Sequence, residues 1–277
     1  MTFYLNPKND FVFKKIFGRN ETKKILIETL NLILSDRLHC PIKEVTYLNP
    51  NIYGDSPSKK QAVVDVLCED QDGCKYLIEM QVASQDDFTS RIIYYSSSIL
   101  ANQLFKGGAY KNLKSVFVLA FCDFILLPEE KDYKNSYGLL NYNSHRDLNK
   151  LSITFIELPK FESQRKNDPK DLNVEEKLYY FMNHAETMTY EDLREISEQN
   201  DLVDRTAMQT HIASWPDNER DKWDAYQKRE REHEEEINAA RFEERKKIIT
   251  RAIKSGLNRK YMQDIFGIKE EEIDKFS

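Results

Sequence analysis

Three features that would fix the class of this chain are missing: a long apolar run, paired cysteines and an excess of positive charge. The longest apolar stretch, residues 116–127, is interrupted by Asp123 and is too short to cross a bilayer. The cysteines show no CxxC spacing, which favours reduced thiols over disulfides or a zinc site. They are Cys40, Cys68, Cys74 and Cys122. The beginning of the sequence lacks a signal-peptide pattern, so we expect a globular, soluble, cytoplasmic protein without a membrane span.

The charge balance is acidic, with 41 Lys and Arg against 47 Asp and Glu, or a net charge of −6. Such a balance is not typical of nucleic-acid binding. It does not exclude it, because a nuclease needs positive charge only around its site, and a charged segment elsewhere can dominate the sum. Residues 227–236 are almost wholly charged. We interpret them as a solvated arm with i,i+4 ion pairs; an acidic substrate mimic is the alternative.

The most informative stretch is residues 60–82, KQAVVDVLCEDQDGCKYLIEMQV. Two runs rich in apolar and β-branched residues flank the turn signal Gln-Asp-Gly at 71–73, which predicts a β-hairpin. Each run carries an acid between apolar neighbours: Asp65 in the first and Glu79 in the second. A lone carboxylate in such a strand costs several kcal/mol unless it is paired or bound to a metal.

The length of the hairpin loop decides whether these acids meet. A two-residue loop would place Asp65 opposite Met80, pointing away from Glu79 and Gln81. A three-residue loop with Gly73 in the left-handed conformation places Asp65 opposite Glu79, beside Gln81. We predict the three-residue loop. Alternation along the strands then sends a second set of side chains to the other, apolar face. They are Val64, Val66, Ile78, Met80 and Val82.

This arrangement suits metal-dependent phosphodiester hydrolysis. Two carboxylates about 5 Å apart across a strand pair repel each other unless a divalent cation lies between them. Oxygen ligands favour Mg²⁺ or Mn²⁺, and we expect Asp65, Glu79 and the backbone carbonyl of Met80 to hold it. Gln81 cannot act as a general base, but its amide could orient water or donate to the transition state.

Helices predicted on either side of the hairpin add supporting candidates. Glu28 lies near the edge of the apolar stripe of a helix at 22–35 and could support the metal indirectly; a solvated helix residue is the alternative. In a helix starting at Asp86 or Asp87 and ending at Lys106, Arg91 and Tyr94 lie beside the buried stripe. They could hold phosphate, because Arg supplies a planar donor fork and Tyr a hydroxyl. Plain surface residues are the alternative.

The rest of the chain divides at a polar stretch. Strands are predicted at 43–48, 115–124 and 151–158, and residues 128–150 fit no assignment. We expect a nuclease-like domain over 1–160, a linker over 161–172 and an all-helical region over 173–277. The helices of that region are predicted at 174–184, 190–199, 202–214 and 216–253, followed by a helix-turn-helix. Glutamates at 270–272 would repel phosphate, which favours packing or dimerisation over DNA reading by that last motif.

Several segments in order resemble one family. They are NDFVFKKIFG, EVTYLNPNI, AVVDVL, DGCKYLIEMQ and the run from DFTSRIIYYSSSILANQLFKGG to Asp123. Over roughly residues 6–160 the chain resembles the Rpn recombination-promoting nucleases, often labelled transposases, of the PD-(D/E)xK superfamily. The resemblance implies a restriction-endonuclease-like mixed sheet flanked by helices, Mg²⁺-dependent DNA endonuclease activity, and Asp65, Glu79 and Gln81 as the catalytic motif. It also implies bacterial roles in recombination or phage defence, and self-association through the C-terminal helices.

Two positions depart from the superfamily pattern: Val64 replaces its Pro and Gln81 its Lys, although the Glu-x-Gln form is usual in this family. Two other functions remain open. One is a degenerate nuclease fold that acts as a DNA-binding or assembly protein. The other treats the two acids as parts of a structural salt-bridge network with nearby lysines, an arrangement that seldom stabilises a fold by itself.

Overall fold

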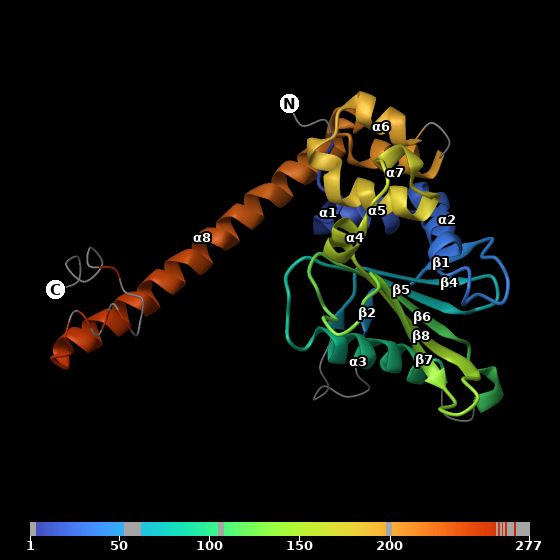
Figure 1. Ribbon diagram of the computed structural model, residues 1–277, viewed down its shortest axis with the longest axis horizontal. Helices are drawn as coiled ribbons and strands as arrows, with labels where there is room; N and C mark the ends of the chain where they lie inside the picture. Colours follow the sequence, from blue (N-terminus) through green and yellow to red (C-terminus); the bar gives the residue numbers. More distant parts are fainter. Residues whose placement is uncertain are drawn as a thin grey trace. The chain divides into compact units, whose positions relative to one another are not determined.

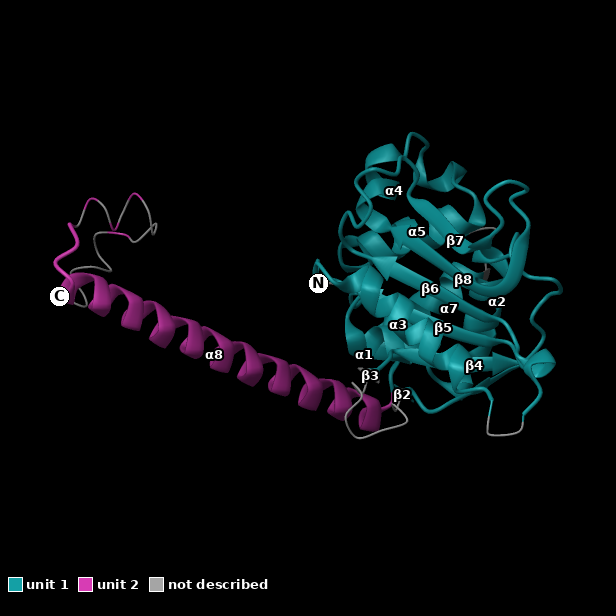
Figure 2. Cartoon of the chain, turned by 90° about the horizontal axis from the view of Figure 1, so that it is seen from below, with its two compact units in different colours: residues 1–215 teal, residues 216–277 magenta. Residues whose placement is uncertain are grey.

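The computed structural model describes residues 4–52, 62–104, 108–197 and 201–258, with single positions at 260, 262, 264 and 269. The chain divides into two compact units, residues 1–215 and residues 216–277 (Figure 2). This division lies after the predicted linker at 161–172. Within the described ranges, no helix is both long and apolar enough to cross a membrane.

Unit 1 combines strands and helices (Figure 1). Its strands are β1 Val45–Tyr47, β2 Asn51–Ile52, β3 Ala62–Val63, β4 Val66–Asp70, β5 Lys75–Gln81, β6 Val116–Cys122, β7 Lys134–Leu140 and β8 Asp147–Glu157. Its α-helices are α1 Asp10–Phe17, α2 Lys23–Ile33, α3 Phe88–Ala101, α4 Leu158–Gln164, α5 Val174–His184, α6 Tyr190–Ser197 and α7 Asp201–Thr210. Short 3₁₀ turns occur at Asn20–Thr22, Tyr110–Asn112, Pro169–Asp171, Ala185–Thr187 and Ile212–Ser214.

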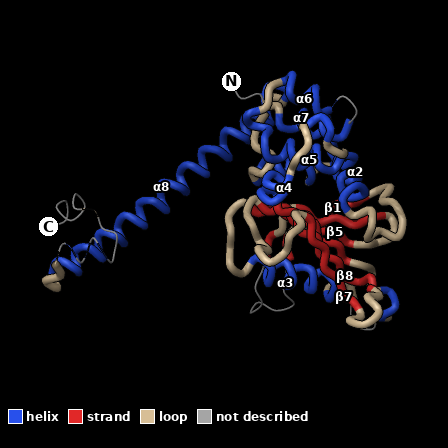
Figure 3. Tube along the Cα trace, viewed as in Figure 1, coloured by secondary structure: helices blue, strands red, loops and turns tan. Residues whose placement is uncertain are grey.

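Six strands form one mixed sheet in the order β1-β4-β5-β6-β8-β7. The central pairs β5–β6 and β6–β8 are parallel, whereas β1–β4, β4–β5 and β7–β8 are antiparallel. Helices lie on both faces of this sheet (Figure 3). The predicted restriction-endonuclease-like architecture is therefore confirmed. Strand β7, which occupies an edge of the sheet, lies in the stretch that fitted no assignment.

Helix α3 covers one face of the sheet. Its predicted stripe, Phe88, Ile92, Tyr95 and Ile99, is buried against apolar side chains of β4, β5, β6 and β8. Helix α1 lies on the other face, and the side chain of Asn9 caps it by accepting the backbone N–H groups of Phe11 and Val12.

The α1 face is built around Phe121 of β6. Its ring contacts Phe13 and Phe17 of α1 at centroid distances of 6.1 and 6.4 Å, and Tyr179 of α5 at 6.3 Å. Helices α5 and α7 contact each other, and α7 also contacts α1 and α2. The helices between residues 174 and 210 therefore pack with the sheet domain, because an aromatic side chain of α5 completes its core.

The first strand of the hairpin is interrupted. A bend at Val64 and Asp65 separates β3, which pairs with β2, from β4. This bend returns Val64 to the α3-side core, so its predicted placement on the opposite face was wrong. Val82 was also predicted to lie on an apolar face, but it is exposed because β5 ends at Gln81 and the chain leaves the sheet.

Unit 2 consists largely of α8, Asp217–Lys254. The charged stretch at 227–236 lies within this helix and is exposed, with Lys228 and Glu232 forming an i,i+4 pair at 3.8 Å. Near the end of α8, Ile249 and Ala252 pack with Met262. The predicted helix-turn-helix falls mostly outside the described residues.

Candidate active site

The hairpin turn sets the register of the two acids. Gly73 has φ +83°, and the Asp70 N–H donates to the Cys74 carbonyl at 3.0 Å. This is the predicted three-residue loop with glycine in the left-handed region. The Asp70 carboxylate stabilises the turn by accepting the N–H groups of Asp72 and Cys74 at 2.8 and 2.9 Å. The ladder then pairs Val66 with Ile78, so the next step places Asp65 beside Glu79.

The two carboxylates are locked to each other's backbone. The Asp65 N–H donates to Glu79 Oε1 at 3.1 Å, and the Met80 N–H donates to Asp65 Oδ2 at 2.9 Å. Glu79 is 6% exposed, and the side chain of Asp65 is 17% exposed. The structure therefore brings together the acids that the sequence predicted to meet, with the Met80 backbone between them.

Burial makes ionisation of both acids unfavourable. It raises the pKa of Glu79 to about 8, and the negative charge of Asp65 adds to that rise. Burial likewise raises the pKa of Asp65, against the opposing effects of the Met80 N–H and the Lys14 ammonium. A positive charge between the carboxylates would favour the ionised forms that burial disfavours. The electrostatics of the pair therefore suit a bound cation.

Lys14 was missed by the sequence analysis. This α1 residue lies with its Nζ 3.4 Å from Asp65 Oδ1 and 2.6 Å from Asp10 Oδ1. Burial acts to lower the pKa of Lys14, but the hydrogen bond and charge of Asp10 outweigh it, and the pKa is raised. The i,i+4 spacing of Asp10 and Lys14 indicates one helix face. Only the packing of α1 on the sheet brings that face to Asp65.

Arg91 and Gln81 meet on the α3 side, a contact that the sequence did not predict. Arg91 Nη2 donates to Gln81 Oε1 at 2.5 Å, and Nη1 donates to Gln85 Oε1 at 2.5 Å. Gln81 Nε2 donates to the Ala83 carbonyl at 2.8 Å. The guanidinium also lies over the Phe88 ring, 5.0 Å from its centroid. These contacts hold Arg91 near the acids, and its charge acts to lower the pKa of Glu79.

Tyr95, the buried one of two adjacent tyrosines in α3, lies close enough to the acids for their charges to affect its pKa. Tyr94 is 39% exposed, and its ring meets that of Tyr95 edge-on at 6.3 Å. Burial raises the pKa of Tyr95, Arg91 lowers it, and the charges of Glu79 and Asp65 raise it further. The sequence analysis singled out Tyr94 because it lies on the strip of Arg91. The structure instead places Tyr95 near the site, since the helix stripe that faces the core also faces Glu79.

Glu28, the other supporting candidate, contacts α7. Its carboxylate forms an ion pair with Arg205 of α7 and lies 3.9 Å from Lys24 Nζ on its own helix. The edge of the α2 stripe therefore faces α7, and Glu28 contributes to helix packing there. We therefore give Glu28 no part in the cation site proposed below, and its support of a metal stays a prediction.

The oxygen donors at Asp65 and Glu79 fit a hard divalent cation. Among the described residues, no group of three or more His, Cys, Asp and Glu side chains is arranged to hold a metal. A cation would therefore be held by these two carboxylates and the Met80 carbonyl, leaving its other positions to water and substrate oxygens. Mg²⁺ commonly binds in this way, through one or two carboxylates and substrate phosphate.

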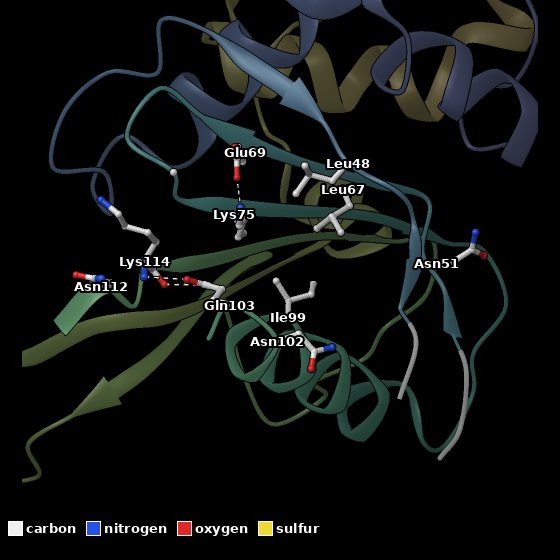
Figure 4. A pocket seen from close by; sticks show the side chains of 11 residues that line it. Leu48, Asn51, Leu67, Glu69, Lys75, Ile99, Asn102, Gln103, Asn112 and Lys114 are labelled. Atoms are coloured by element: carbon white, nitrogen blue, oxygen red, sulfur yellow. Dashed lines mark hydrogen bonds and ion pairs between the residues drawn. The ribbon is translucent and has the colours of Figure 1, made fainter. Parts of the chain in front are cut away.

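The other end of the same hairpin contains a cavity of about 570 Å³ (Figure 4). Its wall includes an ion pair between Glu69 and Lys75, so its acid already has a cationic partner. Gln103 fixes the opposite wall through two hydrogen bonds to the Lys114 backbone, at 2.8 and 3.1 Å. This cavity is therefore distinct from the site formed by Asp65 and Glu79.

Comparison with known proteins agrees with the fold. A family model described as PD-(D/E)XK nuclease family transposase matches residues 7–240. No curated protein and no solved structure matches the chain. The match includes the hairpin, the whole sheet and the helices that pack on it. The family's name contains an acid, any residue and a lysine; Glu79, Met80 and Gln81 have this spacing, with glutamine in place of the lysine. On this evidence the chain belongs to the PD-(D/E)XK nuclease family transposases.

Proposed function

We propose that this protein is a divalent-metal-dependent endonuclease that hydrolyses phosphodiester bonds in DNA. The observation that carries the proposal is the pair of interlocked carboxylates at the open end of the hairpin, the partly buried Asp65 and the buried Glu79. Membership of a nuclease family supports the reaction class. The pKa of both acids is raised even with Lys14 beside Asp65, so a bound divalent cation explains the pair best.

Mg²⁺ is the cation we expect, with Mn²⁺ as a substitute, because the donors are all oxygen. When bound, such a cation lowers the pKa of a water molecule and neutralises charge on the phosphate. The protein's own contribution is to fix the donor positions. The Met80 N–H holds Asp65 Oδ2, and the Asp65 N–H holds Glu79 Oε1, so neither carboxylate needs to reorganise.

Arg91 and Gln81 would then act on the substrate. Arg91 presents a planar donor fork that suits a phosphate. The amide of Gln81 could orient the attacking water once its Nε2 releases the Ala83 carbonyl. Arg91 already donates to Gln81 Oε1, so Gln81 helps to hold the guanidinium in place. Tyr95 would help to exclude water from beneath Glu79, since it is buried beside that acid.

DNA is the substrate we propose, because positive side chains surround the acids despite the negative net charge. Lys14 of α1 and Arg91 of α3 approach from opposite faces of the sheet. Lys8 lies 2.9 Å from Asp123, whose N–H donates to the Gln81 carbonyl. These cations would attract a phosphate backbone to the open end of the hairpin. A role in a mobile element or in phage defence, in a bacterial cytoplasm, would follow.

Plasmid cleavage tests the proposal. Purified protein is incubated with supercoiled plasmid and Mg²⁺, Mn²⁺ or EDTA, beside Asp65→Ala. The matched control is Glu69→Gln, an acid on the same hairpin that is paired with Lys75. We expect nicking or linearisation with either metal, none with EDTA or Asp65→Ala, and full activity in the control.

A folded wild type that binds DNA but cleaves nothing with any metal would contradict the enzyme. It would support the alternative, a degenerate nuclease fold used for DNA binding or assembly. Self-association through the C-terminal helices is a separate proposal. A sedimentation mass of one chain at all micromolar concentrations would contradict it.

A further inference from the structure

The family's name places a lysine two residues after the second acid, and this chain has Gln81 there. An amide can donate a hydrogen bond, but it carries no net charge. Gln81 is also occupied on both of its polar atoms, by Arg91 and by the Ala83 carbonyl. The positive charge expected at this point of the site must therefore come from another residue.

Among the residues that the structure describes, three cations lie near the open end of the hairpin. Arg91 donates to two glutamine carbonyls, Gln81 and Gln85, and is held over the Phe88 ring. Lys8 is paired at 2.9 Å with Asp123, and its side chain is 13% exposed. Lys14 contacts a carboxylate of the acid pair directly, and its side chain is 40% exposed. Lys14 is thus the cation that both touches the site and remains accessible from outside.

The contact between Lys14 and Asp65 is looser than the contact that anchors Lys14. Its Nζ lies 2.6 Å from Asp10 Oδ1, one turn earlier on α1, and 3.4 Å from Asp65 Oδ1. Asp65 Oδ2 already accepts the Met80 N–H, so Oδ1 is the oxygen that Lys14 shares with any divalent cation. Lys14 can give up this oxygen while Asp10 keeps its ammonium at the edge of the site.

We propose that Lys14 supplies the positive charge that a lysine at position 81 would supply, by contacting the phosphate that is cleaved. This inference rests on the proposed nuclease function. The ammonium reaches the site from α1, on the face of the sheet opposite Arg91, so the phosphate lies between two cations. Asp10 is a positioning residue that keeps Lys14 within reach when no substrate is bound.

Moving the positive charge from position 14 to position 81 tests the proposed role of Lys14. Lys14→Met keeps the aliphatic stem and removes the charge, and we expect cleavage to fall about 10²–10³-fold, as for loss of one preorganised donor. Lys14→Arg should keep activity within about tenfold of wild type. The double variant Lys14→Met with Gln81→Lys should recover at least about tenfold over Lys14→Met alone. The matched control is Lys24→Met, a lysine of α2 in an i,i+4 pair with Glu28.

Mn²⁺ binding, measured by calorimetry, separates this role from a structural one. Lys14 competes with a cation for Asp65 Oδ1, so Lys14→Met should bind Mn²⁺ at least as tightly as wild type while cleaving more slowly. A lysine that only held Asp65 in place would lose Mn²⁺ affinity and cleavage together, and that result would overturn the inference.

The remaining outcomes are distinguishable. If wild type cleaves and depends on Asp65, but Lys14→Met cleaves equally well, only the inference about Lys14 fails. If Gln81→Lys gives no recovery in the Lys14→Met background while thermal unfolding is unchanged, the two positions do not share a role and the inference is overturned. If wild type cleaves nothing with either metal, the proposed function fails and the inference falls with it.

Discussion

The two ends of the β4–β5 hairpin carry acids on the same sheet face, but the cross-strand partner of the acid is positive at one end and negative at the other. At the turn end, Glu69 lies opposite Lys75 and forms an ion pair with it. At the open end, Asp65 lies beside Glu79, and burial raises the pKa of both carboxyls. A cross-strand pair of opposite charge stabilises a sheet, whereas like charges destabilise it. The difference indicates that the turn end serves the fold and the open end serves chemistry.

The largest expected effect comes from neutralising the open end. Glu79→Gln keeps the shape of the side chain and an acceptor for the Asp65 N–H but removes a buried charge. We expect cleavage to fall by about 10³-fold or more. In the absence of metal, the free energy of unfolding at pH 8 should rise by roughly 1–3 kcal/mol. Denaturant unfolding with EDTA checks this, and a destabilised variant would contradict the view that Glu79 strains the fold.

The second expected effect is a pH dependence of stability. The folded pKa of Glu79, about 8, lies above its ordinary value of 4.5, so the folded state binds more protons than the unfolded state between these pH values. Stability contributed by the protonated carboxyl is therefore present below pH 4.5 and is lost as the pH rises through about 8. Without metal, the melting temperature should fall over this window.

Mg²⁺ or Mn²⁺ should oppose that fall, because a bound cation favours the ionised carboxylates. Differential scanning calorimetry from pH 5 to 9, with metal and with EDTA, measures both effects. Glu79→Gln is the control and should lose most of the pH dependence. Parallel melting curves with and without metal at every pH would contradict a cation site at the open end.

A third and smaller effect concerns the turn that sets the register. Gly73→Ala places a side chain at φ +83°, where an L-residue is disfavoured by roughly 1–2 kcal/mol. The added Cβ would meet Lys114 Cγ at 3.5 Å, an ordinary contact, so the loss comes from the backbone. We expect a lower free energy of unfolding and a partial loss of cleavage. Gly73→Asn, which tolerates this conformation better, should lose less; equal losses would contradict the backbone explanation.

The smallest effect is expected at the turn end itself. Glu69→Gln removes the charge that pairs with Lys75, and a partly exposed cross-strand pair contributes about 0.2–1 kcal/mol. Cleavage and Mn²⁺ affinity should stay at wild-type levels. Urea unfolding measures the change in stability, and calorimetry measures the Mn²⁺ affinity. A loss of Mn²⁺ affinity in this variant would show that the metal binds at the wrong end of the hairpin for the proposed mechanism.

Local sequence rules predicted the hairpin well, because its register depends on neighbouring residues. A Gln-Asp-Gly turn and a period of two suffice to place Asp65 beside Glu79 and Gln81. The same rules failed one residue away, at Val64. There the chain bends to pair β3 with β2, and the side chain turns to the α3 core. Alternation cannot reveal such a bend, because it assumes a continuous strand.

The sequence by itself determined the buried stripe of α3 and the meeting of two acids, since both follow from short-range periodicity and turn chemistry. The mixed sheet was expected only from the resemblance to a family. Only the tertiary structure decided which cations reach those acids. It brought Lys14 from α1 to one side and Arg91 from α3 to the other, and it assigned Glu28 to α7. It also joined α5 to the sheet through Tyr179. These contacts link residues far apart in the chain, and helix packing on the two faces of the sheet selects them.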